Sequence, residues 1–115
     1  MQDCLFCRIV RGEIPAAKVY EDDEVLAFKD IQPQRPVHVL VIPKKHIASL
    51  AHAGEADIPV LGRMLALANR IAVDQGSPDG FRSIINTGHV GGQEVMHVHM
   101  HIVGGPEPVG PMLKR

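Results

Sequence analysis

The distribution of hydrophobic and polar residues along the chain predicts two helices, one short and one long. Residues 5–10 (LFCRIV) carry apolar side chains at helical spacing, and Gly12 is placed to end that helix. A longer helix is expected after Asp57, a candidate N-cap, because apolar residues recur at i, i+3, i+4 and i+7 spacing from Val60 to the region of Gly76. A continuous apolar stripe of this kind is typical of a helix that covers a sheet.

Strands are predicted in most of the remaining segments, where β-branched and apolar residues dominate. A hairpin is expected around the acidic turn at 21–24, and the almost wholly apolar run at 37–43 (VHVLVIP) is typical of a central strand. Two further strands are expected, one over 81–86 (FRSIIN) and one from 94 or 95 to 103. Strands outnumber helices and their connections are short, which favours an α+β domain with an antiparallel sheet over a parallel doubly wound one.

Composition indicates that the whole chain, 1–115, forms one soluble globular domain, with 45% hydrophobic residues, 22% charged residues and a formal net charge of −1. A net charge near zero argues against a nucleic acid or a membrane surface as partner, since both require a clustered basic surface. No apolar run reaches transmembrane length, and the N-terminus lacks the pattern of a signal peptide. We therefore expect a cytoplasmic protein whose two cysteines form no structural disulfide.

Three of the seven histidines, His97, His99 and His101, occupy alternate positions in the stretch HVHMHIVGG. In a strand they share one face, with Cα atoms about 6.5 to 7 Å apart, while the apolar residues between them share the buried face. Three interpretations are considered: solvated polar positions, a zinc site of the three-histidine catalytic type, or a nucleophilic imidazole with neighbours that handle protons. Three histidines in register disfavour the first.

The loop before this strand offers groups that bind anions. Gly91 and Gly92 let backbone N–H groups approach an anion closely, and Asn86 supplies an amide donor. This collection suits a phosphoryl centre better than a bare zinc ion, although spacing alone leaves both chemical interpretations open.

Cys4 and Cys7 form a C-x-x-C pair that also admits three interpretations. A redox pair would normally open a helix after a strand, and no strand is predicted ahead of these residues. The others are two unpaired structural cysteines and half of a structural zinc site, which needs two more ligands. His46, past the central strand, and His97 are candidates for those ligands.

The segments 6–23, 28–47 and 86–105 resemble the Hint branch of the histidine triad (HIT) superfamily, especially its bacterial nucleotide-binding members. The most specific features are the pattern His-φ-His-φ-His-φ-φ over 97–103 and the GGQ of the preceding loop. Histidine at the third triad position, His101, resembles the hydrolase branches, because the nucleotidylyltransferase branch usually carries Gln there.

Three features depart from the family pattern. Glu94 stands where some Hint proteins have Ser, and Arg35 is a further small difference. The tail after Gly105 is short and lacks the aromatic residue that some relatives insert towards the partner's site.

The resemblance implies a HIT-like fold, an antiparallel sheet of about five strands with an N-terminal helix and one long helix, assembled as a homodimer around the long helix and the central strand. It also implies a phosphoramidase that acts at the α-phosphate of adenosine 5′-phosphoramidates or acyl-adenylates and releases a purine mononucleotide. The implied nucleophile is His99, which forms a covalent histidine–nucleotide intermediate. His101 is implied to contact phosphate oxygens, and His38 to support the triad from a neighbouring strand.

The implied nucleotide pocket has three parts. The apolar slot for the base comprises Phe6, Ile9, Phe28 and Ile31. The ribose hydroxyls are implied to bind Asp30. The phosphate and leaving-group side comprises Asn86, Gly92, Gln93 and Glu94.

Similar bacterial proteins with this C-x-x-C pair hold zinc through two cysteines and two histidines. The resemblance therefore implies a structural zinc on Cys4, Cys7, His46 and His97. No organic cofactor is expected. Two alternatives to the phosphoramidase remain: a nucleotide-binding regulatory protein whose slow hydrolysis is incidental, and a hydrolase that uses a zinc ion held by all three triad histidines.

Overall fold

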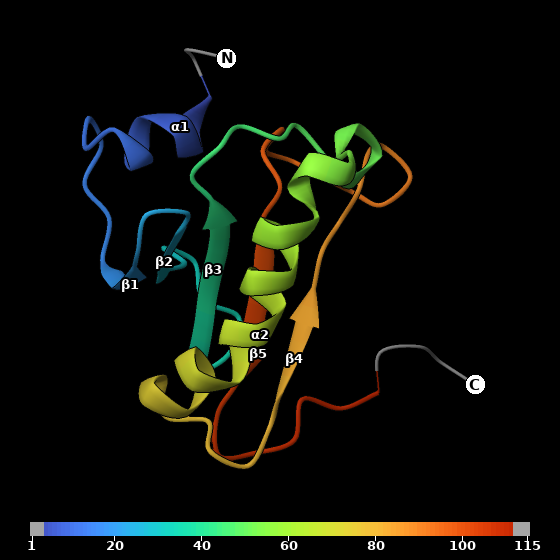
Figure 1. Cartoon of the computed structure of the whole chain (residues 1–115). Helices are drawn as coiled ribbons and strands as arrows, with labels where there is room; N and C mark the ends of the chain where they lie inside the picture. Colours follow the sequence, from blue (N-terminus) through green and yellow to red (C-terminus); the bar gives the residue numbers. More distant parts are fainter. Residues whose placement is uncertain (1–3, 112–115) are drawn as a thin grey trace.

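The fold is taken from a computed structural model that describes residues 4–111 of the chain (Figure 1). Five strands form one sheet: β1 (Lys18–Glu21), β2 (Val25–Lys29), β3 (Val37–Pro43), β4 (Phe81–Ile84) and β5 (Met100–Gly104). The α-helices are α1 (Leu5–Val10) and α2 (Ile58–Gln75), and short 3-10 turns occupy Leu50–His52 and Glu55–Asp57. The strands lie in the order β1-β2-β3-β5-β4 with every neighbouring pair antiparallel, which confirms the predicted α+β fold.

The long helix α2 packs across one face of the sheet (Figure 1). Its buried side chains Met64, Ala68 and Ile71 recur at helical spacing and pack on apolar residues that alternate along β3 and β5. Those strand residues are Val37, Val39, Val41, Met100 and Ile102. The helix ends before Gly76, whose φ of +109° is a left-handed conformation that glycine adopts without strain, as the sequence predicts.

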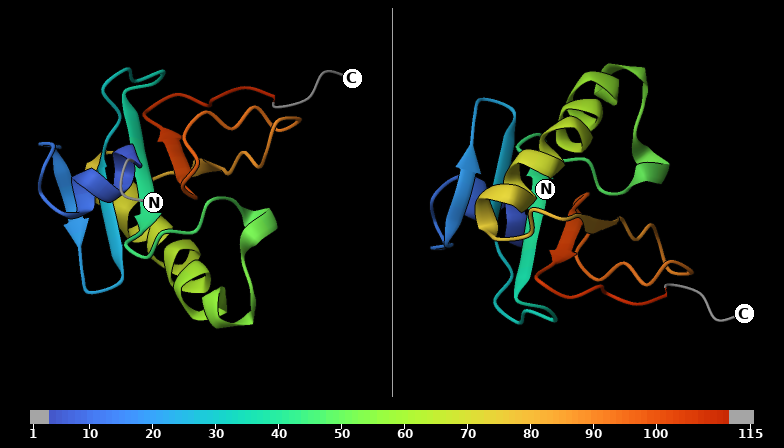
Figure 2. Two further views of the ribbon diagram at one scale, coloured as in Figure 1. Left: turned by 90° about the horizontal axis from the view of Figure 1, so that it is seen from above. Right: turned by 90° about the horizontal axis from the view of Figure 1, so that it is seen from below.

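The short helix α1 packs on the opposite face of the sheet. Phe6 and Ile9 cover the other set of alternate residues in β2 and β3, which comprises Leu26, Phe28, Leu40 and Ile42. Figure 2 shows α1 beside β1 and β2, on the other side of the molecule from β4 and the loop that leads to β5. The part of this face formed by β5 and β4 therefore carries no helix, and the candidate active site extends from α1 onto it.

The last strand begins at Met100, so the prediction that it starts at 94 or 95 is wrong. The reason lies in its partner β3, which ends at Pro43, a residue without an N–H group. The Pro43 carbonyl oxygen pairs with Nε2 of His97 at 2.8 Å, and the Val98 N–H donates to the loop after β3 at 2.7 Å. These residues are held by that loop and not by a strand ladder.

Two element ends also differ from the predictions. β4 ends at Ile84 and not at residue 86, because Ile84 already pairs with the second residue of β5. Asp57 precedes α2 as expected, but its carboxylate accepts from the Gly54 N–H at 2.9 Å and from Lys45 at 2.6 Å, and so closes the preceding turn instead of capping α2. Neither α-helix within residues 4–111 is long and apolar enough to cross a bilayer.

Candidate active site and metal site

The antiparallel register brings residues from three strands onto the face opposite α2. Leu40 of β3 and Ile84 of β4 both pair with His101 of β5, and His38 pairs with Val103. Directly paired residues share a face of the sheet, so His38 and His101 lie on the same side as α1. Their rings meet, with Nε2 of His38 2.9 Å from Nδ1 of His101.

The three triad histidines lie on this face, while the apolar residues between them enter the core under α2, as the alternation predicts. His97 and His99 are nevertheless buried, because Phe6 of α1 covers them with ring centroids 5.9 and 5.1 Å away. The rings of His99 and His101 lie 5.2 Å apart. The interpretation of these histidines as solvated polar positions is therefore wrong for His97 and His99.

The hydrogen bonds of His99 determine which of its ring nitrogens carries the proton. Nδ1 of His99 lies 2.8 Å from the carbonyl oxygen of His97, and a carbonyl oxygen only accepts. Neutral His99 therefore holds its proton on Nδ1 and has a lone pair on Nε2. An imidazole nitrogen with a free lone pair is the form that acts as a nucleophile.

The same reasoning assigns the protons of His38 and His101. The Gln34 backbone N–H donates to Nδ1 of His38 at 3.0 Å, so neutral His38 carries its proton on Nε2 and donates it to Nδ1 of His101. His101 is left with an N–H at Nε2, which suits a phosphate oxygen. The Asp30 carboxylate, 3.4 Å from Nε2 of His38, supports this arrangement electrostatically.

Burial, together with the neighbouring His99 and His38, lowers the pKa of His101, while the carboxylates of Asp30 and Glu94 act in the opposite direction. The net lowering keeps the His101 ring neutral near pH 7. Its Nε2–H is then a neutral hydrogen-bond donor to any phosphate oxygen placed beside it.

An apolar cavity of about 340 Å³ lies between α1 and β2. The four residues predicted for the base, Phe6, Ile9, Phe28 and Ile31, all line it, with Asp30 beside them. The Phe6 and Phe28 rings meet edge to face at 5.6 Å, whereas Ile31 is 94% exposed and contributes only at the rim. Ile14, Pro15 and Leu40 also line this cavity, although they were not predicted from the sequence.

A second cavity of about 290 Å³ lies over β4 and β5. It brings Asn86 together with His38 and His101, as predicted. It also includes Arg35 and Arg82, which the sequence analysis did not assign to the site. Arg82 lies two residues before Ile84 on β4 and so shares its face of the sheet. That this face is the one that carries His101 follows from the pairing of Ile84 with His101, which the sequence does not give.

The GGQ loop is held by hydrogen bonds to nearby backbone groups, and Gly92 and Gln93 do not line this cavity. The Gln93 side chain accepts from the Gly88 N–H and donates to two backbone carbonyls, and the Gly92 N–H donates to His89. A Cβ at Gly91 would lie 2.5 Å from a backbone oxygen, so glycine is required there for packing. Gly92, Gln93 and Glu94 line neither of the two cavities.

The second cluster joins α1 to the segments around β3 and β5. Nδ1 of His97 lies 3.3 Å from Cys4 Sγ, 3.5 Å from Cys7 Sγ and 3.3 Å from Nδ1 of His46, which in turn is 3.2 Å from Cys7 Sγ. A tetrahedral zinc with ordinary bond lengths separates two nitrogens by about 3.4 Å and a nitrogen from a sulfur by about 3.6 Å. The four ligand atoms are therefore already spaced as a tetrahedral metal site requires.

The protonation of His97 also fits a metal ligand. Its Nε2 bonds to the Pro43 carbonyl, which leaves the Nδ1 lone pair directed at the two sulfurs, and metal-binding histidines commonly donate their second N–H in this way. Burial lowers the pKa of His97 to about 4, so the ring is neutral at pH 7. Burial and the adjacent Cys4 thiol raise the pKa of Cys7.

The triad histidines do not converge on one metal position. His97 belongs to the group with Cys4 and Cys7, whereas His101 lies with His38 and Asp30. Within residues 4–111, no cluster of metal-ligating side chains contains all three triad histidines. The geometry thus gives no support to a hydrolytic zinc held by the triad.

Sequence and structure comparisons agree with this architecture. Residues 11–107 match the family model described as "HIT domain". The protein HitA of Neisseria gonorrhoeae is 53% identical over 106 residues, covering 92% of this chain and 99% of HitA. The purine nucleoside phosphoramidase of Escherichia coli strain K12 is 47% identical over 113 residues, covering 97% of this chain and 94% of that protein.

Among solved structures, a histidine triad protein from Clostridium difficile superimposes with a TM-score of 0.89 at 45% identity, covering 96% of this chain and 97% of the other. With its sheet order and its two helices, the chain has the fold of a histidine triad protein. It belongs to the HIT family, as the sequence resemblance indicated.

Proposed function

We propose that the protein is a purine nucleoside phosphoramidase that hydrolyses adenosine 5′-phosphoramidates or acyl-adenylates at the α-phosphate. The observation that carries the proposal is the His99 ring, which lies between Phe6 of the apolar slot and His101 while its Nδ1 bonds to the His97 carbonyl. A relative named purine nucleoside phosphoramidase, 47% identical over almost the whole chain, supports it.

Substrate binding follows from the two cavities. The base enters the apolar slot beside Phe6 and Phe28, and the ribose hydroxyls donate to the Asp30 carboxylate at the rim of that slot. The α-phosphate then lies beside His99 and His101, with the Asn86 amide as a further donor from the second cavity. Neutral donors held in place by a hydrogen-bonded network stabilise negative charge that develops on the phosphate oxygens.

The reaction has two steps. In the first, Nε2 of His99 attacks phosphorus. With a phosphoramidate the P–N bond breaks and the amine leaves neutral because its nitrogen takes a proton from solvent beforehand; with an acyl-adenylate the P–O bond breaks and a carboxylate leaves. In the second, water attacks phosphorus, the P–Nε2 bond breaks, the mononucleotide leaves, and the proton of the water passes to solvent. The Nε2–H of His101 bonds a non-bridging oxygen in both steps.

Rapid mixing with an adenosine 5′-phosphoramidate, followed by intact-mass measurement without acid, tests this mechanism. We expect one adenylyl adduct per chain in the wild type and none in His99→Ala, which should also lose turnover. His89→Ala, a change at an exposed loop histidine, serves as the control and should keep both. Turnover retained in His99→Ala would refute nucleophilic catalysis, and nucleotide binding without turnover in the wild type would favour the regulatory alternative.

We further propose that Cys4, Cys7, His46 and His97 hold a structural zinc ion. Their spacing and protonation fit a tetrahedral site, and thiolate with imidazole is a donor set that zinc prefers. The ion would fasten α1, which carries Phe6, to the rest of the fold. The prediction of no organic cofactor is retained.

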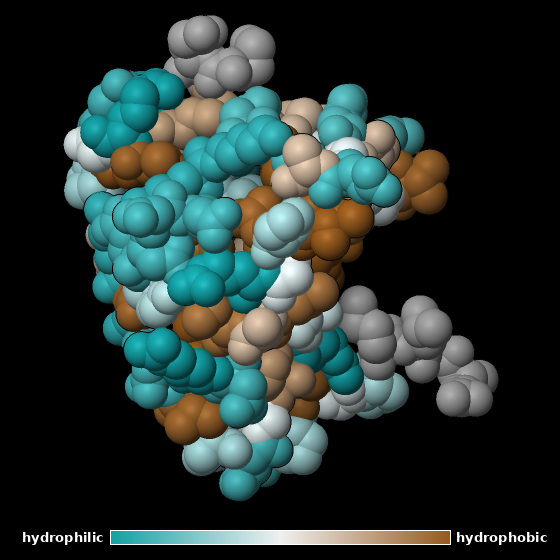
Figure 3. All heavy atoms as spheres, in the orientation of Figure 1, coloured by the Kyte–Doolittle hydropathy of each residue, from teal (hydrophilic) through white to brown (hydrophobic). Residues whose placement is uncertain are grey.

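The homodimer and the cytoplasmic location stay predictions. Residues on the outer side of α2 support an interface there, since Ile58, Leu65 and Val73 are all largely exposed, and Figure 3 shows hydrophobic groups among polar ones over this helix. The central strand β3 lies inside the sheet, so it can contribute to such an interface only through the helix that covers it.

A further inference from the structure

We propose that Arg35, assisted by Arg82, binds an anionic group on the leaving amine. The preferred substrates would then be nucleoside phosphoramidates whose amine carries a negative charge, such as a carboxylate. This inference rests on the proposed phosphoramidase function and assigns a substrate class to it.

The position of the second cavity identifies it as the leaving-group side. The rings of Phe6, His99, His101 and His38 follow one another at 5.1 to 5.2 Å from the base slot to this cavity. A nucleophile and a leaving group lie on opposite sides of phosphorus during an in-line displacement. With the nucleoside in the slot and Nε2 of His99 attacking, the amine leaves towards the cavity that contains His101, Asn86 and the two arginines.

The charges around this cavity favour an anion. Two of its nine lining residues are arginines, and none of the nine is Asp or Glu. The nearby carboxylates line other cavities or none: Asp30 lines the base slot beside His38, Asp79 and Glu107 line the neighbouring cavity that shares Arg82, and Glu94 lines neither the base slot nor the second cavity. A substrate carboxylate in the cavity would therefore meet cationic groups, and none of the described lining residues offers a competing carboxylate.

A neutral backbone carbonyl holds the side chain of Arg35, and no described carboxylate pairs with its charge. Its Nη2 donates to the Val109 carbonyl at 3.1 Å, and it forms no ion pair within residues 4–111. A guanidinium has five N–H donors in a planar fork that matches a carboxylate, and this carbonyl uses only one of them. The tail therefore orients Arg35 while leaving donors for a ligand.

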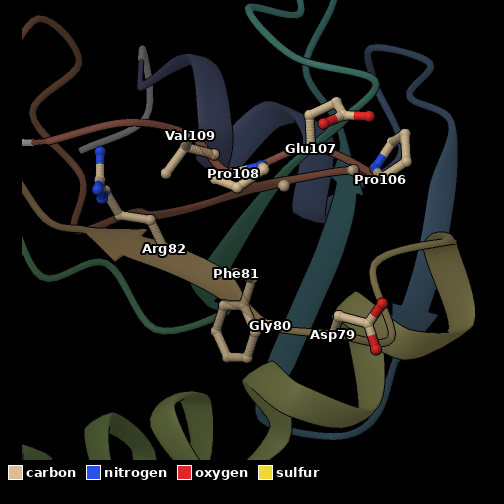
Figure 4. A pocket seen from close by; sticks show the side chains of 10 residues that line it. Asp79, Gly80, Phe81, Arg82, Pro106, Glu107, Pro108 and Val109 are labelled. Atoms are coloured by element: carbon tan, nitrogen blue, oxygen red, sulfur yellow. The ribbon is translucent and has the colours of Figure 1, made fainter.

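Arg82 extends towards the same tail segment. It donates to the Gly110 carbonyl, and Figure 4 shows it directed away from Phe81 and towards Val109, at the edge of a neighbouring cavity of about 390 Å³. The two arginines and the tail residue Val109 thus form one wall of the leaving-group cavity. This gives a function to Arg35, a departure from the family pattern that the sequence analysis left unexplained.

A matched pair of substrates tests the proposal: adenosine 5′-phosphoramidates of glycine and of glycinamide, which differ in the charge of one group. We expect wild-type kcat/KM to be higher for the glycine compound. Arg35→Gln should lower it about fivefold for glycine, as expected for a partly exposed charge-assisted hydrogen bond, and leave glycinamide unchanged. Arg35→Lys should restore part of the preference.

Arg70→Gln is the control, because it removes the same charge from α2 on the other side of the sheet and should change neither substrate. Equal losses for both compounds in Arg35→Gln would mean that Arg35 only anchors the tail, and would overturn the proposal. Turnover of both compounds without a preference would overturn it while leaving the phosphoramidase function intact. If the wild type turned over neither, both would fail.

Discussion

Removing the metal is expected to destabilise the protein and to weaken nucleotide binding. Cys4 and Cys7 come from α1, His46 from the loop after β3, and His97 from the segment before β5, so only the folded chain presents all four ligands. A ligand that binds the folded state alone stabilises it by about 2.7 kcal/mol at a free concentration 100 times its Kd. At this chain length, 1 kcal/mol corresponds to about 4 °C in melting temperature. Chelation, or Cys4→Ser, should therefore lower the Tm by about 10 °C.

The effect should extend to the base slot, because Phe6 lies between the two cysteines. Its ring contacts His97 and His99 and lines the slot, so a loosened α1 displaces one wall of the nucleotide site. We expect Cys4→Ser to raise the Kd for AMP while still forming the His99 adduct at saturating substrate. A selective loss of binding distinguishes this effect from general unfolding.

The assay combines metal content by elemental mass spectrometry, thermal denaturation with and without chelator, and calorimetric titration with AMP. Wild type and His89→Ala should each contain one zinc per chain, and Cys4→Ser much less. A Tm that chelation leaves unchanged, in protein shown to have lost its zinc, would refute the stabilising role. A wild type that takes up no zinc when supplied with it would refute the site.

Two further predictions concern the fold. Gly104→Ala should lower the free energy of unfolding, measured by urea denaturation, by about 2 kcal/mol. The new Cβ would lie 2.2 Å from Ser77 Oγ, an atom held in place by its hydrogen bonds to Gly80 and Gly105. Gly62→Ala is the control, because Gly62 is an open helical position where a Cβ should not destabilise the fold. Asp22→Ala should cost about 1 to 2 kcal/mol at pH 7. Burial raises the pKa of Asp22, but hydrogen bonds from Tyr20, the backbone and Arg63 outweigh burial and hold the pKa below its usual range. The stability that the ionised Asp22 contributes is therefore fully present above the unfolded pKa of about 3.9 and is lost as pH falls below it. Urea titrations should show the gap between wild type and Asp22→Ala closing towards pH 2, and a constant gap would contradict the argument.

The elements predicted well are those whose bounds follow from a local sequence pattern, such as a continuous apolar run or a terminal glycine. β3 has the predicted bounds of 37–43, because a strand buried on both faces reads as a continuous apolar run. The long helix ends at Gly76 as predicted, because a glycine C-cap has a local cause. The residues that the resemblance implies for the base line one cavity, with the mostly exposed Ile31 at its rim, and their role in binding a base stays a prediction.

The parts that were missed depend on contacts between distant segments. The start of β5 is decided by Pro43 in its partner strand, which the sequence around His97 does not reveal. The hydrogen bonds of the GGQ loop, from Gly92 to the His89 carbonyl and from Gly88 to the Gln93 side chain, could not be read from the sequence, and the role of the loop at the phosphate stays a prediction. Arg82 entered the site only through its register with β5. In each case the local sequence permits several partners, and the tertiary structure selects one.

In the proposed function the histidine stretch HVHMHIVGG contributes to two sites, and His97 is the residue that joins them. Its side chain presents the Nδ1 lone pair to Cys4 and Cys7, since its Nε2 proton goes to Pro43. Its backbone carbonyl accepts the Nδ1 proton of His99 and thereby leaves the lone pair on the nucleophilic Nε2. A metal that fixes the His97 ring therefore also fixes the backbone that sets the His99 tautomer. If both proposals hold, alternate residues of one short segment place a structural metal and a nucleophile about one strand repeat apart, and the two sites share no side chain.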